Sequence, residues 1–379
     1  MFVVVFVVSI IAIIMFHEFG HFATAKLFGM KCEKFFLGFG PTLWSVRKGE
    51  TEYGVKAIPA GGFVKIVGMS AYEHVDPADA GRTFYEQAAW KRAIVLVAGS
   101  MTHFIVAIAL LFSALAFVGK PAGVTTTVDL VTAGSPAAAA GLRRGDEILA
   151  VSGQRVVQFE NVRKIIEASA GKTIPIEVVR DGQRQQLSVA IGTKRPDGKP
   201  GGFLGVSPAT ANQRLSLGEA FTSTIVGESS VAAFSWATIQ GLTHAFSPQG
   251  LSSWFDSISQ PGPRDPNGPV SVVGVAQLVN RFGASGDVFL VLGILAQLNI
   301  VLGILNLLPL PPLDGGHLAV LGVEETVNRV RRLRGRSATW RLDPSVLTPL
   351  ALAVILFFVV VSFTALYADI TKPVSELFQ

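Results

Sequence analysis

Residues 2–28 read FVVVFVVSIIAIIMFHEFGHFATAKLF, and this stretch determines how the rest of the chain is interpreted. It is long enough to cross a bilayer, which takes roughly 20 apolar residues in a helix. It has no basic start and no small-residue cleavage site, and a His-Glu-x-x-His pattern lies inside the apolar run. A cleaved signal peptide has different features, so we interpret the stretch as a retained membrane-spanning helix.

The two histidines of this pattern, His17 and His21, are four residues apart. At that spacing they share one helix face about 5–6 Å apart, so both imidazoles can bind one metal ion. Glu18 projects about 100° away, where its carboxylate can accept a proton from an attacking water. An acidic residue inside an apolar helix costs roughly 2.5 kcal/mol or more, so it persists where it is paired, metal-bound or facing a polar cavity. Simple solvation at a helix end near Lys26 is the alternative, but it does not explain the spacing.

The composition is that of a membrane protein. Half of the residues are hydrophobic and 16% are charged, whereas soluble domains carry about a quarter charged residues. Further apolar runs cover residues 93–118, 288–308 and 347–366, so we expect a mainly helical, polytopic protein with four spans and both termini on one side. Cys32 is the only cysteine, which excludes an internal disulfide and a Cys-based structural zinc site. The basic residues form no aromatic-interleaved stripe, so no nucleic-acid partner is expected.

The distribution of arginine predicts the orientation. The short loop between the third and fourth spans should be cytoplasmic because it is rich in basic residues, namely Arg329, Arg331, Arg332, Arg334, Arg336 and Arg341. The segment between the first two spans is then cytoplasmic as well. Residues 119–287 and both termini are expected outside the cytoplasm.

A catalytic zinc ion needs a third protein ligand beside the two histidines. The best acidic candidate is Asp314, which follows the third span within residues 306–317, NLLPLPPLDGGH. The prolines should break the helix there, and the two glycines allow the backbone to turn closely. Two alternatives remain at this point. Asp314 can be the N-cap of a helix that begins near His317, or His317 can be the ligand instead.

Residues 35–69 predict a small β-structure between the first two spans. Turn signals at residues 38–41 and 59–62 flank a segment, 42–58, that reads as strands around a turn at residues 48–50. Irregular backbone at membrane depth must be shielded by protein, so this sheet is expected to be tucked against the membrane.

Residues 122–207 predict a separate α+β domain. The run SPAAAAGLRRGDEI at 135–148 is followed by helical apolar spacing at 161–170 and by a hairpin whose strands, 174–180 and 185–191, flank Asp-Gly. This order resembles a PDZ domain of the bacterial, circularly permuted kind. The resemblance implies a peptide-binding strand and loop near the end of the domain, at Gly202, Phe203, Leu204 and Gly205. PDZ domains bind extended peptides at a sheet edge. The alternative is a mere turn into an edge strand.

The linker at 208–285 divides into two parts. Residues 215–246 predict one amphipathic helix lying along the membrane surface. Residues 247–269 are rich in Pro, Gly and Ser and predict a flexible loop.

Taken together, these motifs resemble the site-2 protease family, the intramembrane zinc metalloproteases, in the bacterial single-PDZ form of the regulator of sigma-E protease type. The shared elements are His-Glu-x-x-His in residues 1–118, Asn-x-x-Pro-x-Pro-x-x-Asp-Gly in residues 286–379, and the PDZ domain between them. The resemblance implies one Zn²⁺ per chain held by His17, His21 and Asp314. It also implies that Glu18 is the acid/base and that Asn306 lies near the site.

The resemblance extends to two further segments. Residues 268–272, GPVSV, are similar to a Gly-Pro segment that the family carries before the third span, and residues 35–69 are similar to its membrane-reentrant β-hairpin. The chain departs from the family in the second span, where a frequent Gly-Pro-x-x-Asn pattern is replaced by GSMTH at 99–103. His103 is therefore either a donor to the developing oxyanion or a buried histidine without a role.

The family implies cleavage of single-span membrane proteins, such as anti-sigma factors already trimmed by another protease, in the bacterial cytoplasmic membrane. The active site would lie towards the cytoplasm, and a C-terminal peptide would bind the PDZ groove outside it. The rival interpretations are a non-catalytic PDZ membrane scaffold and a zinc transporter. Both metal motifs are intact, which disfavours the scaffold, and the spans show no internal repeats, which disfavours the transporter.

Overall fold

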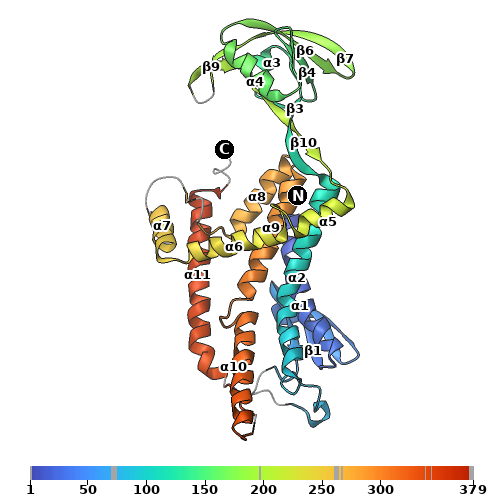
Figure 1. Cartoon of the computed structure of the whole chain (residues 1–379), viewed down its shortest axis with the longest axis vertical. Helices are drawn as coiled ribbons and strands as arrows, with labels where there is room; N and C mark the ends of the chain where they lie inside the picture. The colour runs from blue at the N-terminus through green and yellow to red at the C-terminus, as the bar shows by residue number, and fades with distance from the viewer. Residues whose placement is uncertain are drawn as a thin grey trace. The chain divides into compact units, whose positions relative to one another are not determined.

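The computed structural model describes residues 2–69, 75–195, 198–259, 264–265, 268–337, 339–342 and 344–374. The chain forms two compact units (Figure 1). The first comprises Met1–Ala116 and Ser216–Gln379, and the second comprises Phe117–Leu215. Both motifs of the expected metal site belong to the first unit, and the residues of the expected PDZ domain belong to the second.

Four helices of the described chain are long and apolar enough to cross a membrane. They are α1 (Phe2–Leu27), α2 (Ala89–Ser113, continued by a π-helical turn at Ala114–Val118), α9 (Val288–Asn306) and α11 (Thr348–Thr371). They coincide with the four predicted spans, which confirms that part of the prediction. Large apolar side chains such as Val4 and Leu352 stay exposed on these helices, as expected of surfaces that face lipid.

Between α1 and α2 the chain forms an antiparallel hairpin of β1 (Cys32–Lys48) and β2 (Thr51–Ile66). The predicted turn at residues 48–50 is confirmed. Phe35 of β1 pairs with both Tyr53 and Val64 of β2, so the first half of β1 lies between two segments of β2. Residues 62–66 of β2 consequently form an outer edge of this sheet. Re-entry of the hairpin into the membrane stays a prediction.

The single amphipathic helix predicted for residues 215–246 is wrong, because the segment forms two helices. Helix α5 (Leu217–Ile225) ends where Val226 turns to an extended conformation, and α6 (Val231–Ala245) begins after Ser230. The Ser230 side chain accepts a hydrogen bond from the amide of Ala233, which is the usual signature of a helix N-cap.

The flexible loop predicted for residues 247–269 is also wrong in part. Residues 248–259 form helix α7 (Pro248–Ser259), and residues 260–263 and 266–267 lie outside the described part of the chain. Trp254 of α7 is 2% exposed and packs against Ala365 and Ala368 of α11. The prediction failed because burial of this indole against another helix outweighs a local composition rich in Ser and Gly. A further helix that was not predicted, α8 (Val272–Ala284), follows its N-cap Ser271.

Helix α10 (Asp314–Leu333) follows the proline-rich loop after α9. Its first residue is Asp314 and its N-cap is Leu313, so the alternative in which Asp314 caps a helix beginning near His317 is wrong. Single 3-10 turns lie at Pro77–Asp79 and Pro344–Leu347. Helix α10 is tied to α2 by an ion pair in which Arg92 Nη2 lies 3.1 Å from Glu324 Oε2.

The second unit is built on a sheet with the strand order β10-β3-β4-β6-β7, to which β5 adds by pairing with β4. A separate pair joins β8 to β9. The strands are β3 (Lys120–Val131), β4 (Glu147–Val151), β5 (Gln154–Arg155), β6 (Thr173–Arg180), β7 (Gln183–Ala190), β8 (Gly192–Lys194), β9 (Pro200–Phe203) and β10 (Val206–Gln213). Two helices, α3 (Pro136–Ala139) and α4 (Phe159–Ala168), complete the unit.

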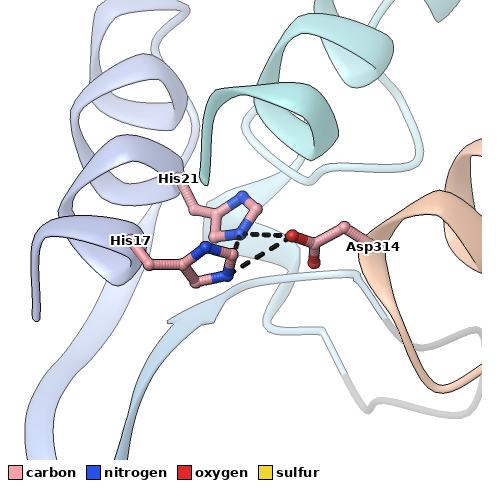
Figure 2. Close-up of side chains that lie close together, drawn as sticks. All are labelled: His17, His21 and Asp314. Atoms are coloured by element: carbon pink, nitrogen blue, oxygen red, sulfur yellow. Dashed lines mark hydrogen bonds and ion pairs between the residues drawn. The ribbon is translucent and has the colours of Figure 1, made fainter. Parts of the chain in front are cut away.

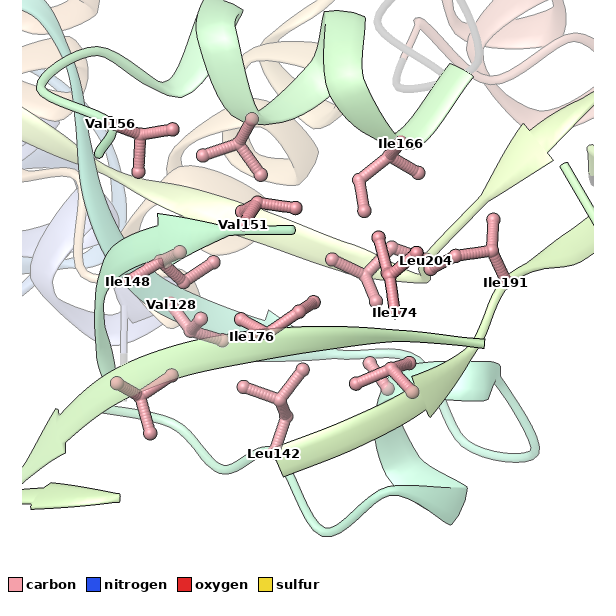
Figure 3. Packing of buried hydrophobic residues seen from close by; sticks show 14 residues of the cluster. Val128, Leu142, Ile148, Val151, Val156, Ile166, Ile174, Ile176, Ile191 and Leu204 are labelled. Carbon is pink, nitrogen blue, oxygen red and sulfur yellow. The ribbon is translucent and has the colours of Figure 1, made fainter. Parts of the chain in front are cut away.

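Figure 3 shows the core of this unit, in which Ile166 of α4 points towards sheet residues such as Ile174 and Ile176. Alternate residues of β6 are buried because one face of the sheet packs under the helix. The predicted hairpin is present as β6 and β7, joined at Asp181-Gly182, where both residues adopt positive φ.

Candidate metal centre

Three side chains that are distant in the sequence meet in the first unit (Figure 2). His17 and His21 come from one face of α1, and Asp314 comes from the start of α10. The Nε2 atoms of the two histidines are 3.3 Å apart, and Asp314 Oδ2 lies 3.3 Å from each of them. These are the three residues that the sequence predicted as metal ligands. His317, the alternative ligand, is not part of this cluster.

The dimensions of this triangle fit a zinc ion. In a tetrahedral site the donor atoms are separated by about 1.6 times the metal–ligand distance, and Zn–N and Zn–O distances of about 2.0–2.1 Å therefore give edges of about 3.3 Å. All three observed edges have this length. Asp314 Oδ2 is also buried without a hydrogen-bond partner in the described chain. Two imidazoles and one carboxylate are a common ligand set of catalytic zinc sites, so the residues fit the ion.

A second contact determines which nitrogen of His21 faces the cluster. Its Nδ1 lies 2.7 Å from the carbonyl oxygen of Val95 on α2. A carbonyl only accepts hydrogen bonds, so Nδ1 carries the proton and donates it. The lone pair of the neutral ring is then on Nε2, the atom that faces His17 and Asp314.

Glycines at the crossing of α1 and α2 let the helices pack closely and still leave room for the two imidazoles. A Cβ atom on Gly99 of α2 would lie 2.2 Å from His21 Nε2 and 2.8 Å from His17 Cε1. A Cβ atom on Gly20 of α1 would lie 2.6 Å from the carbonyl oxygen of Ala98. Small residues at a helix crossing permit such an approach in membrane proteins. Gly99 therefore shapes the metal centre although it supplies no donor atom.

Asp314 is held by the fold of the loop that precedes it. Added Cβ atoms would lie 2.2 Å from the carbonyl oxygen of Leu307 at Gly315, and 2.6 Å from the backbone nitrogen of Pro311 at Gly316. The loop therefore folds back directly over the first turn of α10. As the sequence indicated, the two glycines are needed for this close approach of the backbone.

Glu18 lies beside the hairpin rather than among the three donors. Its side chain is half-buried, and Oε2 accepts a hydrogen bond from the amide of Val64 at 3.1 Å. Gly62 of the same strand is close enough that an added Cβ would lie 3.1 Å from Glu18 Cγ. The outer edge of β2 thus runs along α1 at the position of the glutamate.

His103 of α2 also reaches the metal centre. It is 3% exposed, and its ring centroid lies 5.1 Å from that of His17. Its Nδ1 lies 3.3 Å from Oδ1 of Asn299, whose Nδ2 donates to the carbonyl oxygen of Leu295 at 2.8 Å. Asn299 was not among the predicted site residues, although a polar amide in the middle of the third apolar span was a usable signal.

The other predicted site residues are not brought to the cluster by any contact of the described chain. Asn306 is the last residue of α9, and its side chain makes no hydrogen bond to the described residues. In the second unit, Gly202 and Phe203 end β9, and Leu204 and Gly205 form the turn into β10. Gly202 is buried against α4 and Leu204 is 4% exposed within the core. Peptide binding at these four residues stays a prediction.

A bundle of apolar helices that encloses two histidines and an aspartate defines a membrane-embedded metalloprotein. The sequence model of peptidase family M50 matches residues 5–350, so the chain belongs to this family, the site-2 proteases. The protein is accordingly an intramembrane zinc metalloendopeptidase that uses Zn²⁺ as its cofactor. This result decides against the scaffold and the transporter as rival interpretations.

Named relatives agree with the family assignment. The chain is 35% identical to the zinc metalloprotease Rip1 of Mycobacterium tuberculosis strain Erdman, over 100% of this chain and 98% of that protein. It is 33% identical to the zinc metalloprotease Rip1 of Mycolicibacterium smegmatis, over 98% of each.

Among solved structures, the PDZ domain of the SdrC-like protein from Listeria monocytogenes matches 23% of this chain and 87% of that chain, at 23% identity and a TM-score of 0.20. This TM-score is too low to assign the fold of the second unit. Its membership of the PDZ family stays a prediction.

Proposed function

We propose that His17, His21 and Asp314 hold the catalytic zinc ion of this protease and that Glu18 is its acid/base. The observation that carries the proposal is the triangle of donor atoms, whose three edges of 3.3 Å equal those of a tetrahedral zinc site. When bound, zinc supplies a Lewis acid that polarises the scissile carbonyl and activates the attacking water.

Glu18 performs the proton transfers. The amide of Val64 donates a hydrogen bond to Oε2, which fixes the carboxylate beside the edge of β2. We assign Oε1 to accept the proton of the attacking water and to pass it on to the leaving amine. The half-buried position of the side chain keeps bulk water away from this transfer.

We assign His103 as a hydrogen-bond donor to the carbonyl oxygen of the scissile bond. Because Asn299 Oδ1 can only accept, His103 donates to it through Nδ1, and donation through Nε2 requires a second proton on the ring. Burial disfavours the charged ring, so the imidazolium would form only as negative charge develops on the carbonyl oxygen, and it would stabilise that charge. We assign the same donor role to Asn306, which lies at the end of α9 and whose side-chain amide can donate to a bound substrate.

The position of the hairpin supports a substrate that unwinds at the cleavage site. A transmembrane helix satisfies its own peptide groups, so it must unwind before hydrolysis. The outer edge of β2 at residues 62–66 faces Glu18 and offers backbone groups to an unwound strand. Pairing at this edge would place the scissile bond beside the glutamate. We therefore propose single-span membrane proteins as the substrates, and the resemblance to the family suggests anti-sigma factors already trimmed by another protease as examples.

The membrane topology completes the proposal. The arginine-rich end of α10 and the hairpin would lie on the cytoplasmic side of a bacterial cytoplasmic membrane, with the second unit and both termini outside. As a PDZ domain, the second unit would bind a newly formed C-terminus or exclude untrimmed substrates by size.

The test pairs the wild-type protein with Glu18→Gln, both purified in detergent and assayed for zinc and for cleavage of a tagged single-span reporter. We expect about one zinc ion per chain in both proteins and cleavage only by the wild type. Cleavage by Glu18→Gln would refute the role of the glutamate. Loss of zinc from Glu18→Gln alone would assign Glu18 to metal binding instead.

A further inference from the structure

A cavity of about 770 Å³ lies next to the candidate zinc site. Pro311, Gly316 and His317, which flank Asp314 in the chain, line part of it. The lining continues along α10 to Glu324, two helical turns beyond His317. At 1.5 Å per residue the cavity therefore extends over about 10 Å of that helix.

Beyond His317, the cavity carries an excess of positive charge. Glu324 is its only acidic lining residue in the described chain, and it lies between two guanidinium groups. Arg92 Nη2 and Arg341 Nη1 are each 3.1 Å from Glu324 Oε2. Its other oxygen accepts from the amide of Leu342 at 3.2 Å. One carboxylate cannot neutralise two guanidinium groups, so the described part of the lining carries a net positive charge.

Arg92 also has unused hydrogen-bonding capacity. Its side chain is 9% exposed, and its Nε is buried without a hydrogen-bond partner among the described residues. Leaving a buried N–H unpaired is costly, so such groups are normally satisfied by protein, water or a ligand. Since Arg92 lines the cavity, an acidic group of a bound molecule can supply the missing acceptor.

The remaining wall suits apolar peptide side chains. It includes Phe84, Leu96, Val320 and Leu352, and the volume falls within the range of about 300–1,000 Å³ typical of ligand sites. A segment from the end of a membrane span combines apolar residues with flanking charges. The cavity thus fits a peptide that is mostly apolar and carries one acidic group.

We propose that this cavity binds the cytoplasmic flank of the substrate and that Arg92 and Arg341 bind a carboxylate on that flank. The inference rests on the proposed zinc site at Asp314, from which its distance is measured. Glu324 is ten residues after Asp314 on α10, which corresponds to about 15 Å. An extended peptide rises about 3.3 Å per residue, so the carboxylate belongs four or five residues from the cleaved bond.

The test compares two single-span reporters that carry Asp or Asn four and five residues from the cleavage site on the cytoplasmic flank. The full-length protein is assayed in vesicles of phosphatidylcholine. We expect kcat/KM to be about three- to tenfold higher for the Asp reporter. Arg341→Gln should abolish this preference. Glu324→Gln should increase it, because it removes the carboxylate that competes for the two guanidinium groups.

Arg332→Gln is the matched control, because Arg332 is an exposed arginine of α10 that does not line the cavity. It should keep the wild-type ratio. If Arg341→Gln and Glu324→Gln both slow the two reporters equally, the charges are merely structural and the inference is wrong. Equal kcat/KM values of the wild type for the Asp and Asn reporters would overturn the inference as well.

Two further measurements separate this inference from its alternatives. Binding of the fluorescently labelled reporters to Glu18→Gln, followed by anisotropy, should show the same preference for Asp. If the wild type cleaves neither reporter, the proposed function fails, and this binding contrast still decides the inference. Phosphatidylglycerol is then added to the vesicles. The proposal is refuted if phosphatidylglycerol stimulates cleavage by the wild type but not by Arg341→Gln, while kcat/KM is the same for the Asp and Asn reporters. In that case a lipid headgroup occupies the cavity.

Discussion

Replacing Gly99 by alanine should destroy the metal centre without touching a ligand. The added Cβ would lie 2.2 Å from His21 Nε2 and 2.6 Å from its Cε1. Ordinary contacts between such atoms lie at about 3.5 Å or more, so the imidazole has to move by about 1.3 Å. A shift of that size breaks the 3.3 Å triangle with His17 and Asp314. It also pulls His21 Nδ1 away from the carbonyl oxygen of Val95.

A misplacement of about 1 Å typically costs about 100-fold in rate, which corresponds to about 2.7 kcal/mol of transition-state stabilisation. We therefore expect Gly99→Ala to lower kcat/KM on a single-span reporter by at least about 100-fold and to lower the zinc content of the purified protein. Metal analysis and reporter cleavage in detergent measure the two effects.

Gly293→Ala is the matched control, because Gly293 lies in the apolar helix α9 and an added Cβ there meets no atom within 4 Å. It should keep wild-type zinc and activity. Thermal unfolding of both variants separates a local defect from loss of the fold. Gly99→Ala protein with one zinc ion per chain and full activity would show that the helix crossing is looser than the structure indicates.

Three further changes test other parts of the molecule. His103→Asn should lose less activity than His103→Ala, because its amide keeps a hydrogen-bond donor but not the charge of the imidazolium, and His103→Ala should lose about 10- to 1,000-fold in kcat; equal losses would exclude the oxyanion role. Burial alone would raise the pKa of Asp146, but hydrogen bonds from Arg180 and from a backbone amide outweigh it and lower the pKa. The stabilisation that the Asp146 carboxylate gives to the second unit should therefore be complete above the pKa of the unfolded chain, about 3.9. It should be lost as pH falls through the folded pKa. Hydrogen exchange of Asp146→Asn at pH 7 should show that the free energy of unfolding of this unit falls by about 2–3 kcal/mol. Gly274→Ala would place Cβ 2.5 Å from Asp369 Oδ2, so it should lower the thermal unfolding temperature, unlike Gly241→Ala, whose Cβ meets nothing within 4 Å.

Much of the candidate site could be predicted from local patterns. The four-residue spacing of His17 and His21 places both on one helix face whatever the rest of the chain does. The prolines and glycines around Asp314 predicted a tight turn, and the structure has the loop folded over the first turn of α10. The hairpin turn at Asp181-Gly182 was equally visible, because its backbone conformation is favoured by those two residue types.

Other features depended on contacts that no local pattern contains. Helix α7 forms in a stretch whose composition favours a loop, because Trp254 is buried against α11. The break between α5 and α6 follows an extended Val226, in a segment where apolar periodicity alone predicted one helix. The contact between Asn299 Oδ1 and His103 Nδ1, at 3.3 Å, joins α9 to α2 and has no counterpart in a local pattern.

The sequence by itself determined the apolar runs of the four spans, the pair of histidines on α1 and the acidic candidate for the third ligand. Each of these depends on the length of an apolar run or on a short motif, and both are local properties of the chain. Only the tertiary structure decided that Asp314 lies 3.3 Å from both imidazoles, and that Arg92, Glu324 and Arg341 meet beside a cavity. Those distances arise from the packing of α1, α2 and α10, whose contacting residues are far apart in the sequence.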